Sequence, residues 1–262
     1  MGILNVTPDS FFQGSRASAE ADIIAKASQI LAEGGKIIDI GAESTRPGAE
    51  PVSEADELKR LIPAIKLVRK SFPDAIISAD TYKAKVAEAA VDAGADIIND
   101  ISGGAFDKAM FAAVARLKVP YILMHSKGRT EIMQQAPFYE NVLKEVMLYF
   151  SEKIRGLRDL GLNDIILDPG FGFAKSLEHN YILLDMLEEF KIFELPLMLG
   201  VSRKRMINEV LNIKAAEALN GTTVINTIGL LKGAQILRVH DVKAASEAVK
   251  IVTFAKNTGN VD

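Results

Sequence analysis

The chain has 262 residues, of which 48% are hydrophobic and 25% charged, and its formal net charge at neutral pH is −3. This length and composition suit one large globular domain or two small ones, with enough chain to bury a sizeable core. The lack of a long basic run argues against nucleic-acid binding, and the absence of cysteine excludes disulfides, thiolate zinc sites and cysteine nucleophiles.

Eight short runs rich in Ile, Val and Leu are the candidate strands. In chain order they are Gly2–Val6, Lys36–Ile40, Ala75–Ala79, Asp96–Asn99, Pro120–Met124, Asp164–Leu167, Leu197–Leu199 and Ala234–Val239. The runs are mainly apolar and do not alternate regularly with polar residues. This pattern is typical of parallel strands that are covered on both faces.

The segments between these runs carry the periodicity of amphipathic helices. The apolar stripe of the first helix comprises Ile23, Ala27, Ile30 and Leu31. Gly34-Gly35 is expected to end that helix. Ser53 and Asp56 resemble a capping box at the start of the next helix, and Pro63 inside its stripe predicts a kink or a late start.

A long fifth helix is predicted from Tyr139 to Leu157, and two helical stretches, 203–212 and 215–232, precede the last strand. Right-handed crossovers between eight parallel strands close most simply into a (β/α)₈ TIM barrel, here a single domain over residues 1–262. The alternative is an open doubly wound sheet. Such a sheet often carries a G-x-G-x-x-G motif, whereas the Gly-Phe-Gly at 170–172 is followed by Lys175 at the position of the third glycine.

Hydrogen-bonding or charged residues follow all eight candidate strands. In chain order they are Asn5, Glu43 to Arg46, Asp80, Asn99 with Asp100, His125, Asp168, Ser202 to Lys204, and Arg238 with His240. Barrel enzymes place their chemistry at the carboxyl ends of the strands, and the helix-to-strand turns of this chain offer few reactive groups. One mouth of the barrel is therefore predicted to be functional.

These residues also have plainer interpretations. Asp80, Asn99 or Asp168, taken singly, is more commonly a helix cap or a turn residue than a ligand-binding group. His179 lies in a predicted helix away from any strand end, so we interpret it as structural. Lys204 lies in a helical first turn, where a cation opposes the helix dipole, and this placement favours a ligand-binding role.

The polar side chains at the predicted mouth fall into two chemical groups. Asp80, Asp168 and Asn99 suit a flat heterocycle rich in N–H donors, because a carboxylate accepts two hydrogen bonds in parallel. The groups that suit phosphate oxygens are Asn5, Thr45, Arg46, Lys204, Arg238 and His240. The residues alone predict a planar, donor-rich group bound beside an anion.

No apolar run reaches the roughly 18 residues that a membrane span needs. The N-terminal segment has no basic stretch, and Pro8 and Asp9 interrupt its apolar start, so we expect no signal peptide. These features predict a cytoplasmic protein with no membrane partner.

Seven segments, in order along nearly the whole chain, resemble the signatures of the dihydropteroate synthases, which are pterin-binding enzymes. They are Met1–Phe11, Asp39–Ala49, Ser78–Lys83, Ile98–Asp100, Asp168–Phe173, Ser202–Lys204 and Arg238–Val242. The resemblance implies a transferase of folate biosynthesis. Its substrates are the diphosphate ester of (7,8-dihydropterin-6-yl)methanol and p-aminobenzoate, and its products are 7,8-dihydropteroate and pyrophosphate.

The resemblance also implies roles for individual residues. Those expected to hold the pterin are Asp80, Asn99, Asp168 and Lys204, with Asp80 and Lys204 as the catalytic pair. Those expected around the pyrophosphate are Thr45, Arg238 and His240, with Asn5 as a ligand of Mg²⁺. The loops from Thr7 to about Ala19 and from Glu43 to about Val52 would close over p-aminobenzoate. Members of this family are often homodimers and are targets of sulfonamides.

Two alternatives share the same fold. A methyltetrahydrofolate–corrinoid methyltransferase would not need a pyrophosphate site, so Thr45, Arg46, Arg238 and His240 favour the synthase. A non-catalytic pterin-binding protein would lack a catalytic or anion-binding residue, and we find none missing from the sequence. We expect no covalent enzyme intermediate, because the chain has no cysteine and no activated serine is evident.

Overall fold

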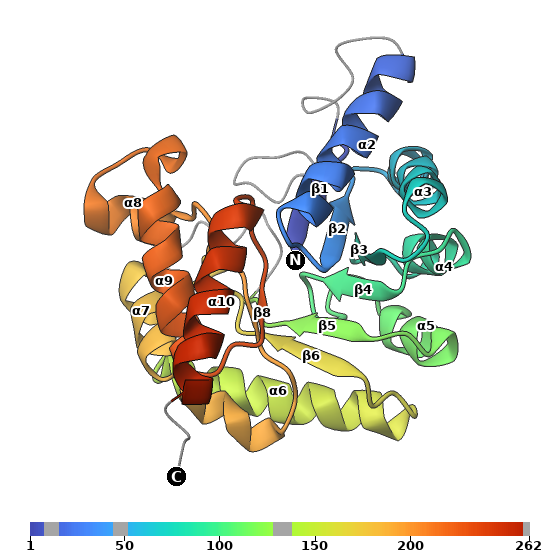
Figure 1. The fold of residues 1–262 in the computed structure, drawn as a ribbon. Helices are drawn as coiled ribbons and strands as arrows, with labels where there is room; N and C mark the ends of the chain where they lie inside the picture. Colours follow the sequence, from blue (N-terminus) through green and yellow to red (C-terminus); the bar gives the residue numbers. More distant parts are fainter. Residues whose placement is uncertain (8–15, 44–51, 128–137, 259–262) are drawn as a thin grey trace.

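The computed structural model describes residues 1–7, 16–43, 52–127 and 138–258. Strands and helices alternate along the chain (Figure 1). The strands are β1 (Gly2–Asn5), β2 (Ile37–Gly41), β3 (Ile76–Asp80), β4 (Ile97–Asp100), β5 (Tyr121–Met124), β6 (Ile165–Asp168), β7 (Met198–Leu199) and β8 (Ile236–Leu237). Each lies within one of the predicted runs or extends it by one residue, so the predicted strands are confirmed.

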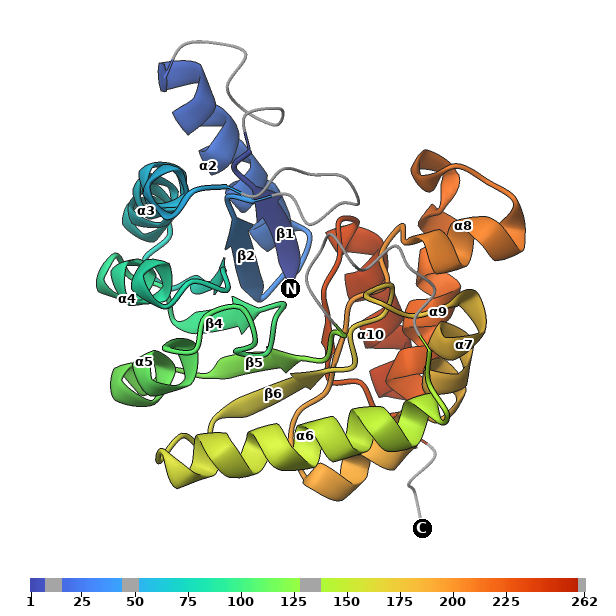
Figure 2. The same ribbon diagram turned by 180° about the vertical axis from the view of Figure 1, so that it is seen from behind.

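The helices surround the strands, with α2 to α5 on one side of the molecule and α7 to α10 on the other (Figures 1 and 2). Their bounds are α2 (Arg16–Ala32), α3 (Glu54–Ser71), α4 (Ala84–Asp92), α5 (Met110–Leu117), α6 (Val142–Asp159), α7 (Leu177–Asp185), α8 (Arg205–Leu211), α9 (Leu219–Leu231) and α10 (Val242–Thr258), with 3₁₀ helices η1 (Leu187–Phe193) and η2 (Ala215–Glu217). No helix in the described part of the chain is long and apolar enough to span a bilayer.

The strands form a closed ring. β1 to β6 pair in parallel in sequence order, and β7 pairs in parallel with β8. Two parallel bridges, Leu167 with Leu197 and Gly2 with Val239, join the two groups of strands. At the second bridge the amide of Ile3 donates to the carbonyl of Val239 at 3.0 Å. The predicted (β/α)₈ TIM barrel is confirmed, and the open doubly wound sheet is not what the chain forms.

Burial of apolar side chains stabilises the ring of strands and the helices packed around it. Most buried side chains belong to a large core that includes residues of both strands and helices. A smaller cluster of Ile97, Ile122, Ile166 and Met198, from β4 to β7, is separate from it. These four residues lie at or near the amino ends of their strands, so the carboxyl ends remain for polar groups.

The helix starts show where the sequence prediction held and where it failed. α3 begins at Glu54, because Ser53 caps it by accepting a hydrogen bond from the amide of Asp56 at 3.1 Å. The helix runs on through Pro63, so the alternative of a late start was wrong. The cap and three acidic residues in the first turn stabilise a start well before the proline.

The long fifth helix was predicted to begin at Tyr139, but α6 begins at Val142 with Asn141 as its cap. The Asn141 side chain accepts from the amide of Lys144 at 2.9 Å. Tyr139 instead packs before the helix, and its hydroxyl donates to the carbonyl of Ala174 at 3.0 Å. The two stretches predicted before the last strand are present as α8 and as η2 with α9.

Candidate functional site

An arginine held between two carboxylates lies at the carboxyl ends of the strands. Arg238, just after β8, donates from Nε to Asp39 and from Nη2 to Asp80, each at 2.6 Å. Asp39 on β2 is fully buried, and the Asp80 side chain at the end of β3 is 11% exposed. Asn99 on β4 donates to both carboxylate oxygens of Asp39 at 3.3–3.4 Å. Four strands thus supply one connected polar network.

Strand register explains this convergence. Asn5 pairs with Gly41, Gly41 with Asp80, and Asp80 with Asn99, so four residues lie at one level of β1 to β4. Gly41 leaves room for its neighbours, because a Cβ there would lie 3.3 Å from Asp80 Cβ, which is a tight contact, and 3.6 Å from both Asn5 Oδ1 and Asp80 Oδ2. The amide oxygen of Asn5 and the Asp80 carboxylate therefore both lie next to Gly41.

Asp168, at the end of β6, reaches the same mouth. It is 5% exposed, and one carboxylate oxygen accepts from the amide of Gly170 at 2.8 Å. Gly200 lies between Asp168 and Arg238, since a Cβ there would be 3.7 Å from Asp168 Oδ2 and 3.9 Å from Arg238 Cβ. The second carboxylate oxygen of Asp168 therefore lies on the side of Gly200 and Arg238.

Lys204 comes from the loop after β7. Its Nζ donates to the carbonyl of Phe171 at 2.5 Å and lies 4.6 Å from the ring centre of Phe173. Gly172, with φ +79°, allows this approach, because a Cβ there would stand 3.2 Å from Lys204 Cδ. The Asp-Pro-Gly-Phe-Gly-Phe loop after β6 therefore supports the lysine while its first residue, Asp168, stays in the mouth.

Removal from water shifts the pKa values of these groups. Burial raises the pKa of Asp80 to about 7, against the influence of Arg238, and burial also raises the pKa of Asp168. Burial lowers the pKa of Lys204 to about 8. Burial opposes the charge of Arg238 as well, but the carboxylates of Asp39 and Asp80 raise its pKa above the ordinary value. Perturbed pKa values of this kind concentrate at functional sites.

His240, two residues after Arg238, is joined to the loop after β7. Ser202 Oγ accepts from the His240 amide at 3.2 Å and lies 3.1 Å from its Nδ1. The loop that carries Lys204 after β7 and the loop that carries Arg238 after β8 are therefore connected at the same mouth.

His125, at the end of β5, has a supporting role. Lys175 Nζ lies 3.0 Å from His125 Nδ1 and donates to the carbonyls of Gly170 at 2.9 Å and Phe173 at 3.1 Å. Burial, with the nearby charge of Lys175, lowers the pKa of His125 to about 2, so its ring is neutral. The pair ties the loop after β5 to the loop that carries Asp168.

The helix-cap interpretation of Asp80, Asn99 and Asp168 was wrong. The N-caps of the following helices α4, α5 and α7 are Lys83, Ala109 and Ser176. Asp168 does cap its own turn through Gly170. The interpretation of His179 as structural is supported, because its Nδ1 accepts from the amide of Ser176 in a capping box.

The structure brings Asp80, Asn99, Asp168, Lys204 and Arg238 together at one mouth, with Asn5 and His240 beside them. Thr45 and Arg46 lie outside the described residues, as do residues 8–15 and 44–51 of the two predicted closing loops.

Sequence reasoning gave no role to Asp39, the buried partner of Arg238. The available signal was a carboxylate in the middle of the apolar run Ile37–Ile40, since an isolated charge is costly to bury without a partner.

The sequence matches a family model described as pterin binding enzyme over residues 1–240. It is 45% identical over 254 residues to the dihydropteroate synthase of Escherichia coli strain K12, covering 96% of this chain and 89% of that protein.

Solved structures agree with these matches. Dihydropteroate synthase of Yersinia pestis in a sulfonamide drug complex superimposes with a TM-score of 0.91 at 41% identity, covering 98% of this chain and 94% of that one. Dihydropteroate synthase of Xanthomonas albilineans with 4-aminobenzoic acid gives a TM-score of 0.90 at 37% identity, with coverage of 100% and 93%.

Proposed function

Because this chain belongs to the dihydropteroate synthases, within the pterin-binding enzymes, we propose that its barrel mouth performs their reaction with the residues described above. The reaction transfers the (7,8-dihydropterin-6-yl)methyl group from its diphosphate ester to p-aminobenzoate. The products are 7,8-dihydropteroate and pyrophosphate, so the protein is a transferase of folate biosynthesis.

The observation that carries the residue assignment is the convergence of Asp80, Asn99 and Asp168 beside two cations. The pterin ring presents several N–H donors along one edge, and carboxylates that are already desolvated bind such an edge without a further large cost of dehydration. Asp168 would accept a parallel pair of these donors, and Asp80 and Asn99 would bind the opposite part of the ring. Lys204 would lie beside the ring, where its charge influences the ring's protonation.

The diphosphate would lie toward β1 and β8. Arg238 and His240 follow β8, and Asn5 ends β1, which is the neighbouring strand in the ring. Thr45 is proposed as a further phosphate ligand on the strength of the sequence motif alone. The guanidinium of Arg238 is a permanent cation, and a cation already fixed beside the leaving group stabilises its developing charge in the transition state without reorganisation.

The chemistry requires one bond to break and one to form. The methylene C–O bond breaks, and its electron pair leaves with pyrophosphate, while electron release from the pterin ring supports the electron-poor methylene carbon. The arylamine nitrogen then forms the new C–N bond and loses a proton to water or to the released pyrophosphate. Positioning matters more than deprotonation of this weakly basic amine. We propose direct transfer to p-aminobenzoate with no covalent enzyme intermediate.

The residues present fit a magnesium ion at the diphosphate. Mg²⁺ prefers hard oxygen ligands and is commonly shared between a protein oxygen, water and substrate phosphates. The Asn5 amide oxygen, next to Gly41 at the end of β1, would be such a ligand. When bound, the ion would neutralise charge on the departing pyrophosphate.

We propose that p-aminobenzoate binds at the same mouth, near Lys204 and under the loops from Thr7 to about Ala19 and from Glu43 to about Val52. The relatives solved with 4-aminobenzoic acid and with a sulfonamide drug support this assignment, because a sulfonamide resembles p-aminobenzoate in shape and charge. Sulfonamides should then inhibit by competing with p-aminobenzoate.

We also propose a homodimer. Large apolar side chains are exposed on neighbouring helices α9 and α10, where Leu231 is 56%, Ile251 70% and Phe254 72% exposed. Burial of such side chains is a common driving force for association. Light scattering coupled to gel filtration would give a mass near twice 28.4 kDa for the dimer. The cytoplasmic location stays a prediction.

The decisive experiment supplies the protein with dihydropterin diphosphate, p-aminobenzoate and Mg²⁺, and measures dihydropteroate and pyrophosphate separately. Formation of both in equal amounts supports the synthase. Ring binding with neither product would favour a non-catalytic pterin-binding protein. Methyl transfer from methyltetrahydrofolate to a corrinoid would favour the methyltransferase.

A further inference from the structure

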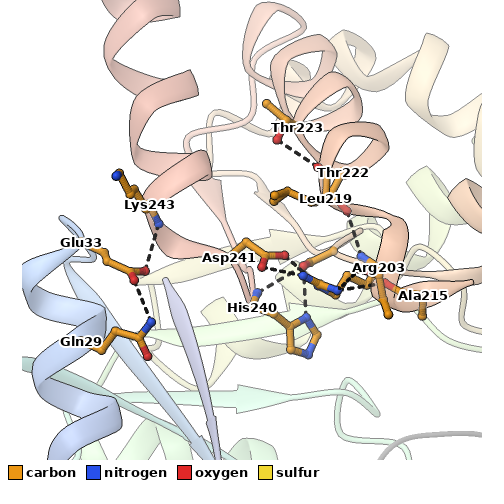
Figure 3. A network of polar contacts seen from close by, with 12 residues as sticks. Gln29, Glu33, Arg203, Ala215, Leu219, Thr222, Thr223, His240, Asp241 and Lys243 are labelled. Carbon is orange, nitrogen blue, oxygen red and sulfur yellow. Dashed lines mark hydrogen bonds and ion pairs between the residues drawn. The ribbon is translucent and has the colours of Figure 1, made fainter.

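The loops after β7 and β8 are joined at two successive positions (Figure 3). Ser202 Oγ contacts the amide and Nδ1 of His240 at 3.2 and 3.1 Å. One residue further along each loop, Arg203 donates from Nε and Nη2 to the two carboxylate oxygens of Asp241, both at 2.8 Å. The two loops are therefore fixed in register by one hydroxyl contact and one bidentate ion pair.

Arg203 is held in an uncommon backbone conformation. Its φ is +58°, in the left-handed region that L residues rarely adopt. Its amide donates to Thr222 Oγ1 at 3.1 Å, its carbonyl accepts from Asn208 at 3.3 Å, and its Nη1 donates to the carbonyls of Ala215 and Ala216, each at 3.0 Å. A strained residue of this kind persists only where its surroundings fix it, and such residues concentrate at functional sites.

The neighbours of this pair are the reason to assign it a functional role. Arg203 stands between Ser202 and Lys204, and Asp241 directly follows His240. Under the proposed function Lys204 lies beside the pterin ring and His240 at the diphosphate. The ion pair therefore sets the spacing between residues at the two ends of one substrate.

The ion pair also compensates the negative charge of Asp241 near the proposed diphosphate site. A free carboxylate directly after His240 would repel the diphosphate, since neighbouring charges at a partly desolvated mouth interact strongly. Arg203 lowers the pKa of Asp241, chiefly through their hydrogen bonds, so the carboxylate is ionised and compensated within the pair. The fork geometry of a guanidinium matches both carboxylate oxygens, which the single ammonium of a lysine cannot do.

Building on the proposed function, we propose that Arg203 and Asp241 form a positioning pair that sets the placement of Lys204 relative to His240, and so tunes binding of the diphosphate end of the donor substrate. Neither residue is assigned a contact with substrate. Their effect passes through the adjacent residues.

Two variants test the pair. Arg203→Lys keeps the charge and loses the fork, and Asp241→Asn keeps the shape and loses the charge. The matched control is Arg69→Lys, because Arg69 is similarly buried and binds Asp96 and the carbonyl of Gly94 at the opposite end of the barrel. The readouts are the KM for dihydropterin diphosphate, the Kd for pyrophosphate, the Kd for the dihydropterin alcohol that lacks the diphosphate, and the Tm.

For Arg203→Lys and Asp241→Asn, we expect the KM for the donor and the Kd for pyrophosphate to rise about tenfold, as for a modest displacement of a positioned group. The Kd for the alcohol should change by less than about twofold, and Arg69→Lys should leave all three constants unchanged at a similar loss of Tm. Equal weakening of alcohol and pyrophosphate binding, or no change beyond that of Arg69→Lys, would overturn the proposal. Because the binding measurements need no turnover, they separate this outcome from failure of the proposed reaction, which would appear as wild-type protein that forms no dihydropteroate.

Discussion

The Nε atom of Arg238 donates a 2.6 Å hydrogen bond to Asp39, which lies 199 positions earlier in the chain. This contact crosses from the loop after β8 to the interior of β2, and it leaves the outer part of the guanidinium to Asp80. Asp39 is completely buried, so it fixes the Arg238 guanidinium from the protein interior. The contact links the closure of the barrel to the geometry of its mouth.

We expect Asp39→Asn to weaken both the fold and the site. Removal of one charge from a buried pair costs about 3–5 kcal/mol when the partner is left alone. Because Asp80 still neutralises Arg238, we expect a loss of about 2–3 kcal/mol in the free energy of unfolding, measured by urea denaturation, and a lower kcat/KM for the donor.

The control for this variant is Glu88→Gln, which removes an exposed ion pair with Arg116. Pairs of this kind contribute about 0–1 kcal/mol. If Asp39→Asn lost no more stability than Glu88→Gln, the buried contact between Asp39 and Arg238 would not have the importance that we assign to it.

Much of the fold could be predicted because its signals are local. Each strand is a short apolar run, and the helix ends at Ser53 and Gly34 depend on neighbouring residues. The late start predicted from Pro63 was wrong. The cost of a proline inside a helix is also a local effect, but the N-cap upstream outweighed it. The start of the fifth helix was misplaced for a related reason: Tyr139 continues the helical stripe, yet it is buried against a different loop.

The site was predictable only in part, because hydrogen-bond partners depend on which strands become neighbours. The polar residues after the strands could be recognised, and barrel closure then explains why they meet. The partner of Arg238 could not be identified, since nothing near Asp39 in the sequence points to a residue 199 positions away. Likewise, the sequence placed Arg203 and Asp241 in motifs but gave no indication of their pairing.

The assignment of Asp168 to the pterin predicts a large kinetic effect for Asp168→Asn. Replacing one carboxylate oxygen with an amide nitrogen removes a charge-assisted hydrogen bond and sets two donors against each other. We expect a loss of about 2–4 kcal/mol in transition-state binding, which is a fall in kcat/KM of roughly 30- to 1000-fold.

Asp164→Asn is the matched control for that variant. Asp164 is exposed and precedes β6, so the same strand carries it at the opposite end of the barrel. The kcat/KM of the Asp164→Asn variant should stay within about twofold of the wild-type value. An unchanged rate in Asp168→Asn would remove Asp168 from the pterin site.

The assignment of Asn5 to Mg²⁺ predicts that the metal acts on the diphosphate and not on the ring. Chelation of Mg²⁺ with EDTA should weaken binding of dihydropterin diphosphate at least about tenfold and leave binding of the dihydropterin alcohol unchanged. Asn5→Ala should raise the Mg²⁺ concentration required for half-maximal activity. Calorimetry with both ligands checks this, and equal weakening of both ligands by EDTA would contradict the placement of the metal.

The pKa values at the mouth predict a narrow pH optimum. Burial raises the pKa of Asp80 to about 7, so below that pH the carboxyl becomes protonated and can no longer accept a parallel pair of N–H donors as a charged carboxylate does. Burial lowers the pKa of Lys204 to about 8, so above that pH its positive charge is lost. We therefore expect kcat/KM for the donor to rise toward pH 7 and to fall above pH 8, with apparent pKa values that belong to the interacting cluster.

Two lysine variants assign the alkaline side of that profile. Lys204→Arg keeps a cation that does not titrate in this range, so the fall above pH 8 should move out of the measured range even though kcat is reduced. Lys175 is the competing candidate, because burial lowers its pKa to about 7. Its ammonium donates to the backbone carbonyls of Gly170 and Phe173, and we assign it no contact with the substrate. The fall in kcat/KM above pH 8 should therefore remain in Lys175→Met. A fall that persists in Lys204→Arg and vanishes in Lys175→Met would transfer the assignment to Lys175.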